Sequence, residues 1–230
     1  MQAKTNNSLV ELLITLIIPS LILMKWSDEA NLGAVRALLL ALAFPLAWGA
    51  YDLVRRRKLN LFAALGLVSI LLTGGIGLLE LDKHWLAVKE AAIPALLGIG
   101  VIISGYTRYP LVRSLLYSPK LVNVGLVQQN LEMRGNVQAF EARLQAANWQ
   151  IGGTFFFSAT MNYFLATWIV VSPAGSAAFN EELGRLTLMS YPMIAIPSML
   201  MMVAVFYGLS RAIKNLAGLK LMEILHQAGE

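Results

Sequence analysis

The sequence predicts an all-α fold: a polytopic membrane protein, built as a bundle of about six transmembrane helices with short interfacial helices. The chain of 230 residues is 57% hydrophobic and 13% charged, and its mean hydropathy is +0.65. A soluble domain is nearer half apolar and a quarter charged, so much of this apolar surface is expected to face lipid. The charged residues also fall between long uncharged runs, as in a chain that crosses a bilayer repeatedly.

Six segments have the length and apolar character of membrane spans. A helix needs about 20 residues to cross hydrocarbon about 30 Å thick. The predicted spans, all in one integral membrane domain over residues 1–230, are 9–24, 32–53, 59–79, 85–106, 149–171 and 188–209. The N-terminal apolar run lacks a small-residue cleavage site, so it is expected to be a span and not a removed signal peptide.

The distribution of Lys and Arg predicts the orientation of these spans. With both termini in the cytoplasm, the outer side holds only Lys25, Arg36, Lys83, Lys89 and Arg185. The inner side holds the remaining basic residues, including the cluster Arg55, Arg56, Arg57 and Lys58. Because basic residues accumulate in cytoplasmic loops, we expect a multi-pass protein of the bacterial inner (cytoplasmic) membrane with cytoplasmic N- and C-termini. The basic cluster is expected first to fix topology and second to contact anionic lipid.

The predicted cytoplasmic loop 107–148 is the longest extramembrane segment. A short helix is expected to open at Pro110 and a second helical stretch at Asn136. In the second stretch Phe140, Leu144 and Ala147 recur at helical spacing. This pattern fits either a partner-binding surface helix or an amphipathic connector packed against the helix ends, and the connector is favoured. Residues 211–227 are expected to form another short interfacial helix.

Small and polar residues recur along three of the predicted spans, and such residues point toward other helices because lipid cannot satisfy them. The stripes are Ser8, Glu11, Thr15 and Pro19 in the first span, Gly66, Ser69, Thr73 and Gly77 in the third, and Thr154, Ser158, Asn162 and Ala166 in the fifth. We expect them to face one another around the bundle centre. Tight helix packing is favoured over a substrate path as their cause.

Charged residues gather near the predicted outer ends of the helices. The residues expected to line a polar cavity are Glu80, Asp82, Lys89, Glu90, Asn162, Glu181 and Arg185. Lys89 and Glu90 lie just inside the fourth span, where an ionisable group needs a partner or a water-filled cavity. An ion pair of Lys89 with Glu181, or of Glu90 with Arg185, would join two hairpins. The group is equally consistent with a vestibule for a charged solute or lipid headgroup, and with snorkelling side chains plus one structural ion pair.

Three of the spans contain an Ile-Pro step, which begins at Ile18, Ile93 or Ile196. A proline removes a helical hydrogen bond and kinks the helix, and kinked helices build midplane sites in transporters. The similarity of the first and third steps is too short to establish an inverted repeat of three helices plus three.

Several functional classes lack their required residues. The chain has no cysteine and only two histidines, His84 and His226, so we expect no metal site and no cofactor. It has no motif of a serine protease, phosphate loop or zinc protease, and it is therefore not expected to be an enzyme. The net charge of +5 is explained by cytoplasmic loops, and nucleic acid is not an expected partner. The expected partners are the lipid bilayer and either further copies of the chain or other membrane proteins.

Residues 44–104 carry a family resemblance. This segment contains, in order, a helix that ends in a basic cluster, a helix that closes in a Gly-Gly turn, an acidic residue, an aromatic residue and an intramembrane lysine. This order, with the later run Met161-Asn162-Tyr163-Phe164-Leu165-Ala166, resembles the intracellular septation protein A group of inner-membrane proteins. The long loop 107–148 and the segment 172–230 depart from that group. The TGGIGL and FNEELGR strings are similar to a six-helix bacterial family, and the resemblance implies an envelope or division-related scaffold.

Two functions therefore remain open. The first is the scaffold that the resemblance implies, and the alternative is a small secondary transporter or lipid-handling protein with a polar outer-side vestibule. A hydrated cavity lined by Lys89, Glu90 and Asn162 would favour the transporter. A dry, packed seam would favour the scaffold.

Overall fold

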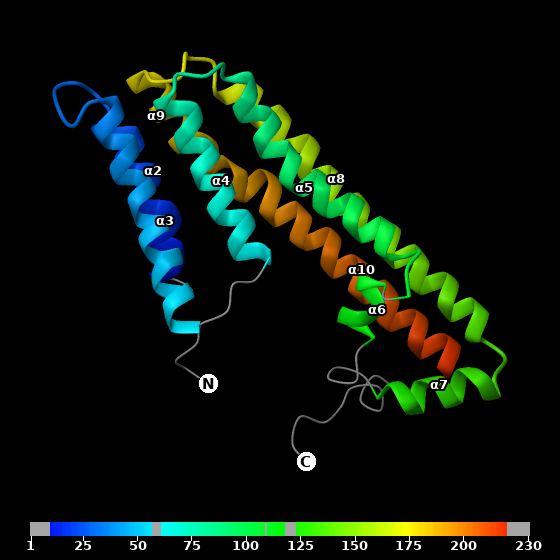
Figure 1. Ribbon diagram of the computed structural model, residues 1–230. Coiled ribbons are helices and arrows are strands. Elements are labelled where there is room, and N and C mark those ends of the chain that lie inside the picture. Colours follow the sequence, from blue (N-terminus) through cyan, green and yellow to red (C-terminus); the bar gives the residue numbers. More distant parts are fainter. Residues whose placement is uncertain (1–9, 57–60, 109, 118–122, 220–230) are drawn as a thin grey trace. The chain divides into compact units, whose positions relative to one another are not determined.

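The chain folds into helices (Figure 1), and the computed structural model describes residues 10–56, 61–108, 110–117 and 123–219. The elements are η1 (Leu13–Ile17), α2 (Ile18–Trp26), α3 (Ala34–Arg56), α4 (Leu61–Leu78), α5 (His84–Ser104), α6 (Leu111–Leu116), α7 (Val124–Met133), α8 (Val137–Ile169), α9 (Ala177–Ser190), η2 (Tyr191–Ala195) and α10 (Ile196–Ala217). The two η elements are π-helical turns. No strand occurs in these ranges, which confirms the predicted all-α class.

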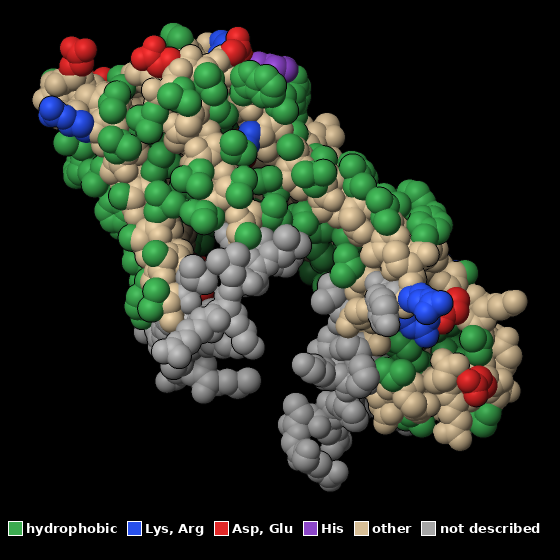
Figure 2. All heavy atoms as spheres, viewed as in Figure 1, with side chains coloured by type: hydrophobic (Ala, Val, Ile, Leu, Met, Phe, Trp, Pro, Cys, Tyr) green, Lys and Arg blue, Asp and Glu red, His purple; other side chains and the backbone are tan. Residues whose placement is uncertain are grey.

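Three helices in the described ranges are long and apolar enough to cross a membrane: Ala34–Asp52, His84–Ser104 and the continuous helix Ala177–Ala217. The described part of α4 adds a shorter apolar helix, Ala64–Leu78. The predicted fifth span lies in α8, where polar side chains such as Thr154, Ser158 and Asn162 lower the hydropathy. Hydrophobic side chains are spread over the exposed helix faces (Figure 2), as expected for helices that face lipid.

Two helices are longer than the sequence predicts. α8 runs without a break through residues that we assigned to the cytoplasmic loop, and α9, η2 and α10 form one helix that begins before residue 188. Their 33 and 41 residues span about 50 Å and 60 Å, which exceeds hydrocarbon about 30 Å thick. Residues 211–217 continue α10 and do not form a separate interfacial helix, and residues 220–227 lie outside the described residues.

The chain divides into two compact units. Unit 1 comprises Met1–Ile93 and Ala159–Ala195, and unit 2 comprises Pro94–Ser158 and Ile196–Glu230. Both units include residues of α5, of α8 and of the continuous helix that α9, η2 and α10 form.

The core of unit 1 joins α2, α3, α4 and α9 with the first part of α5 and the last part of α8. Its most buried large side chains are Leu38, Leu86, Leu165 and Phe179. Glycine allows the closest approach within this core, because a Cβ on Gly184 of α9 would lie 2.7 Å from the backbone oxygen of Ser20 in α2.

The predicted outer loops lie together at one end of unit 1. Lys83 donates a hydrogen bond to the carbonyl of Val171, and Asn180 Nδ2 donates to the carbonyl of Ala34 at 2.8 Å. The Glu80 side chain packs against Gly175, where a Cβ would lie 2.7 Å from Glu80 Cγ. These contacts tie the three loops to one another.

The carboxylate of Glu182 holds the turn between α8 and α9. It accepts hydrogen bonds from the Val171 and Ser172 backbone N–H groups at 3.0 and 2.9 Å and from Ser172 Oγ at 2.8 Å. Because Glu182→Ala leaves both N–H groups without this acceptor, we expect a loss of about 2 kcal/mol in unfolding free energy, measured by thermal unfolding in detergent micelles. The control is Glu181→Ala, which removes an exposed ion pair with Arg185 and should cost less than about 1 kcal/mol. Equal losses in the two variants would contradict the role of Glu182.

Unit 2 contains a second apolar cluster, in which α7 packs against α10 and α8. Val127 and Leu131 of α7 are fully buried, together with Phe140, Leu144 and Ile213. The predicted opening of α6 at Pro110 is confirmed, whereas α7 was not predicted. Since α7 and α10 cover the apolar face that contains Phe140 and Leu144, the packed-connector interpretation of this stretch is favoured.

Candidate functional site

Lys89 is a buried cation in the first part of α5. This helix begins after Asp82, whose Oδ1 accepts the backbone N–H of His84 at 2.7 Å. Lys89 follows in an otherwise apolar stretch, and only 7% of the residue is exposed. A lysine at such a position must be paired or must face a polar cavity.

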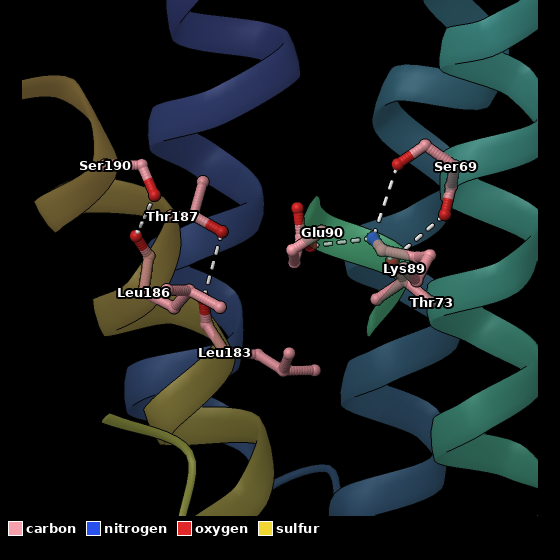
Figure 3. A network of polar contacts seen from close by, with 8 residues as sticks. All are labelled: Ser69, Thr73, Lys89, Glu90, Leu183, Leu186, Thr187 and Ser190. Carbon is pink, nitrogen blue, oxygen red and sulfur yellow. Dashed lines mark hydrogen bonds and ion pairs between the residues drawn. The ribbon is translucent and has the colours of Figure 1, made fainter. Parts of the chain in front are cut away.

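The Lys89 ammonium has a partner for each of its three N–H groups (Figure 3). It donates to Thr73 Oγ1 at 2.7 Å and to Ser69 Oγ at 3.3 Å, both on α4. Its third partner is Glu90 Oε1 at 2.7 Å. The ammonium is therefore saturated by acceptors in this arrangement.

The pairing of Lys89 with Glu90 is unusual for helix neighbours. Consecutive residues on a helix do not face each other, so the two side chains must bend toward a common space to meet. The Glu90 side chain is 28% exposed and that of Lys89 is 6% exposed. An ion pair in apolar surroundings carries a large desolvation cost, which makes this pair a candidate for function.

The ion pair faces a cavity of about 270 Å³ within unit 1. Sites for drug-sized ligands hold roughly 300–1,000 Å³, so this cavity suits water, an ion or a small solute. Its polar lining consists of Thr15, Ser20, Ser69, Thr73, Lys89, Glu90 and Thr187. Its remaining lining is apolar and comes from α2, α3, α4 and α9, with Leu16 from η1.

Toward the cavity, the three threonine hydroxyls can act only as hydrogen-bond acceptors, because each has given its proton to a backbone carbonyl. Thr15 Oγ1 donates its proton to the Glu11 carbonyl at 2.7 Å, Thr73 Oγ1 to the Ser69 carbonyl at 3.0 Å, and Thr187 Oγ1 to the Leu183 carbonyl at 2.9 Å. Each hydroxyl has a single proton, so only its lone pairs remain for other partners. Thr73 already uses a lone pair to accept from Lys89.

Prolines occur in α2, α3 and α5, close in sequence to residues that line the cavity. Proline has no N–H, so the carbonyl four residues earlier loses its α-helical donor. For Pro19, Pro45 and Pro94 these carbonyls belong to Thr15, Ala41 and Glu90, and all three residues line the cavity. Ser20 contributes a further polar atom, because its Oγ is buried without a hydrogen-bond partner.

The structure brings two of the predicted cavity residues together, Lys89 and Glu90. Asp82 instead caps α5, Glu80 packs at Gly175, and Asn162 is not part of the cavity lining. The predicted ion pairs between hairpins are wrong. Arg185 pairs with Glu181 at 3.0 Å, because α9 starts early enough to place both on successive turns of one helix.

Arg185 lines a different groove of unit 1. This groove has a volume of about 530 Å³ and is lined by Met24, Trp168, Ile169, Arg185, Leu188 and Met189. Of the predicted basic cluster, Arg55 and Arg56 end α3, and Arg57 and Lys58 lie outside the described residues.

Two of the predicted polar stripes meet at the cavity. Thr15 and Pro19 of the first stripe and Ser69 and Thr73 of the third span line it. The stripe of α8 does not, since Thr154 donates to the Gln150 carbonyl and Ser158 bonds to Ser198 at 2.8 Å in unit 2. Ser20 and Thr187 were not among the predicted cavity residues. A helix assigned from residue 177 would have placed Thr187 on the same face as Leu183.

No family model, curated protein or solved structure matches the chain. The resemblance to the septation protein A group therefore stays a prediction. In the described ranges no group of three or more His, Asp or Glu side chains could hold a metal ion. The polar chemistry of the cavity comes from hydroxyls, carbonyls and one ion pair.

Proposed function

We propose that the protein is a small secondary transporter of the bacterial inner membrane, with six membrane-spanning helices and both termini in the cytoplasm. Its solute binds in the unit 1 cavity at Lys89 and Glu90. The observation that carries this proposal is a buried ion pair that faces an open space of about 270 Å³ lined by polar groups.

The cavity supports transport over a scaffold role. A helix bundle that serves as a scaffold gains stability from close packing, and a void beside a buried ion pair lowers that stability. Kinked helices around a polar midplane site are, in contrast, a common construction of transporters. Prolines in α2 and α3 line the cavity, and α5 contains Pro94 four residues after Glu90.

The loop contacts support the proposed orientation. Segments assigned to the outer side meet in unit 1 through Lys83, Asn180 and Glu80. In unit 2, Asn136 Nδ2 of the predicted cytoplasmic loop donates to the Leu216 carbonyl in the predicted cytoplasmic C-terminal segment at 2.9 Å. Both sets of contacts join segments that were assigned to the same side of the membrane.

A single cysteine in the cavity tests the transport function. The chain has no native cysteine, so Thr187→Cys carries the only thiol. In a transporter, water reaches the cavity from each side in turn. We therefore expect this thiol, in protein reconstituted in vesicles, to react with a membrane-impermeant methanethiosulfonate reagent added to either side. The measurement is the labelled fraction by mass spectrometry.

The matched control is Thr160→Cys, on an exposed position of α8 in the predicted fifth span. This thiol faces lipid and should stay unlabelled, because a charged reagent does not enter hydrocarbon. Absence of labelling at residue 187 from both sides would reject the transporter and favour the scaffold. Labelling from one side only would also reject transport, since a vestibule that opens to one side of the membrane gives that result.

A further inference from the structure

Lys89 and Glu90 present charges of both signs to the same cavity of unit 1. They are consecutive residues of α5, and their charged groups meet at 2.7 Å. In Figure 3, Glu90 lies between Lys89 and Thr187 of α9, and all three residues line the cavity. A small molecule in this space therefore has a carboxylate and an ammonium within its reach.

The charge balance of the cavity disfavours a ligand with a net charge. Within the described part of the chain, the other residues that line the cavity include no Asp, Glu, Lys, Arg or His. Lys89 and Glu90 therefore neutralise each other. An anion or a cation that enters alone leaves one uncompensated charge in largely apolar surroundings, which is strongly unfavourable. The ligand that fits this balance is neutral overall.

We propose that the cavity binds a small zwitterion, such as an α-amino acid with a short side chain. The inference rests on the transport function proposed above and names its substrate class. The carboxylate of the ligand takes the place of Glu90 at the Lys89 ammonium, which keeps its hydrogen bonds to Thr73 and Ser69. The ammonium of the ligand pairs with the carboxylate of Glu90. Each charge keeps a counter-charge, and no proton has to move.

The two side chains lie close enough for this change of partners. An α-amino acid carries its ammonium and its carboxylate on one carbon atom, and Lys89 and Glu90 are adjacent in the chain. A solute without charges leaves the ion pair intact and gains nothing from it. Because a buried ion pair carries a large desolvation cost, a ligand that uses both of its groups gives a reason for its presence.

The rest of the lining fits such a ligand. Ser20 Oγ is buried without a hydrogen-bond partner, and a hydroxyl can donate to a carboxylate or accept from an ammonium. Thr187 Oγ1 gives its proton to the Leu183 carbonyl, so toward the cavity it can accept from an ammonium. The apolar lining from α2, α3, α4 and α9 receives a short apolar side chain, and a volume of about 270 Å³ suits a small solute.

Thermal unfolding of the full chain in detergent micelles tests the ligand class. The probes are glycine, L-alanine and L-serine at neutral pH. The counterparts of similar size are propionate and ethylamine, which carry one charge, and propionamide, which carries none, all at equal ionic strength. Because a ligand that binds the folded state stabilises it, at least one amino acid should raise the unfolding midpoint by roughly 5–10 °C at about a hundredfold its dissociation constant. At the same concentration each counterpart should raise it by less than about 1 °C.

Variants of the chain place the ligand in the cavity. Ser20→Ala removes a buried hydroxyl that has no partner within the protein, so this variant should fold and bind the amino acid about tenfold more weakly. The double variant Lys89→Met/Glu90→Leu removes both charges and should show no shift, and Ser20→Ala decides the question if the double variant does not fold. The control Lys25→Met, at an exposed site in the last turn of α2, should match the wild type.

The outcomes separate the ligand class from the transport function. The zwitterion site is overturned if none of the three amino acids shifts the midpoint or if a counterpart shifts it equally. It is also overturned if the shift persists in the double variant, or if Ser20→Ala binds as tightly as the wild type. Labelling of Thr187→Cys from both sides without a shift retains transport and rejects the zwitterion. A shift without labelling from both sides retains the zwitterion site and rejects transport.

Discussion

Replacement of Glu90 by leucine is expected to lower the unfolding free energy by about 3–5 kcal/mol, because the Lys89 ammonium then stays buried without a counter-charge. Thr73 and Ser69 still accept hydrogen bonds from Lys89, but neutral acceptors do not compensate a full charge. The Lys89 side chain is 6% exposed, so solvent compensates little of its charge.

The double variant Lys89→Met/Glu90→Leu should recover most of this loss. Removal of both charges removes their desolvation cost, and replacing a buried ion pair with apolar residues is often neutral or stabilising. The measurement is reversible unfolding of the wild type, both single variants and the double variant in mixed micelles. The reference cycle is Glu181 with Arg185, an exposed pair whose coupling should stay below about 1 kcal/mol.

The cycle also separates stability from function. If the double variant is as unstable as Glu90→Leu, the pair holds the fold together and the proposed site loses its main support. If the double variant is stable, the ion pair is not needed to hold the fold together. A stable double variant is the result expected of an ion pair that is retained for function.

The existence of the helices and of the ion pair could be predicted, because both follow from local composition. Long uncharged runs predicted the helices, and Lys89 and Glu90 were conspicuous as charges inside an apolar segment. The lining residues Ser20 and Thr187 could not be predicted. Their role depends on the packing of α2 against α9, two helices far apart in sequence that approach through Gly184.

The ends of the helices were predicted less well, and prolines explain part of the difference. Both π-helical turns end immediately before an Ile-Pro-Ser sequence, at Ile18 and at Ile196. A π turn inserts an extra residue, which accommodates the missing N–H and the ring of proline without ending the helix. The helix continues through Pro197 to Ala217, so this proline does not end the sixth span.

Replacement of Gly184 by alanine should lower the unfolding free energy by about 3 kcal/mol, near the upper end for overpacked cores. The added Cβ would lie 2.6 Å from Met24 Cγ and 2.7 Å from the Ser20 backbone oxygen. A methionine side chain can move aside, but the backbone oxygen moves only if α2 shifts away from α9. This shift would displace Ser20 from the cavity as well as weaken the packing of unit 1.

The matched control is Gly66→Ala in α4, where an added Cβ meets no atom within 4 Å. Alanine favours a helix over glycine, so this variant should be equal to the wild type or more stable by up to about 1 kcal/mol. Thermal unfolding in micelles gives the stability difference. Equal stability of the two variants would mean that α2 and α9 do not approach each other as closely as Gly184 permits.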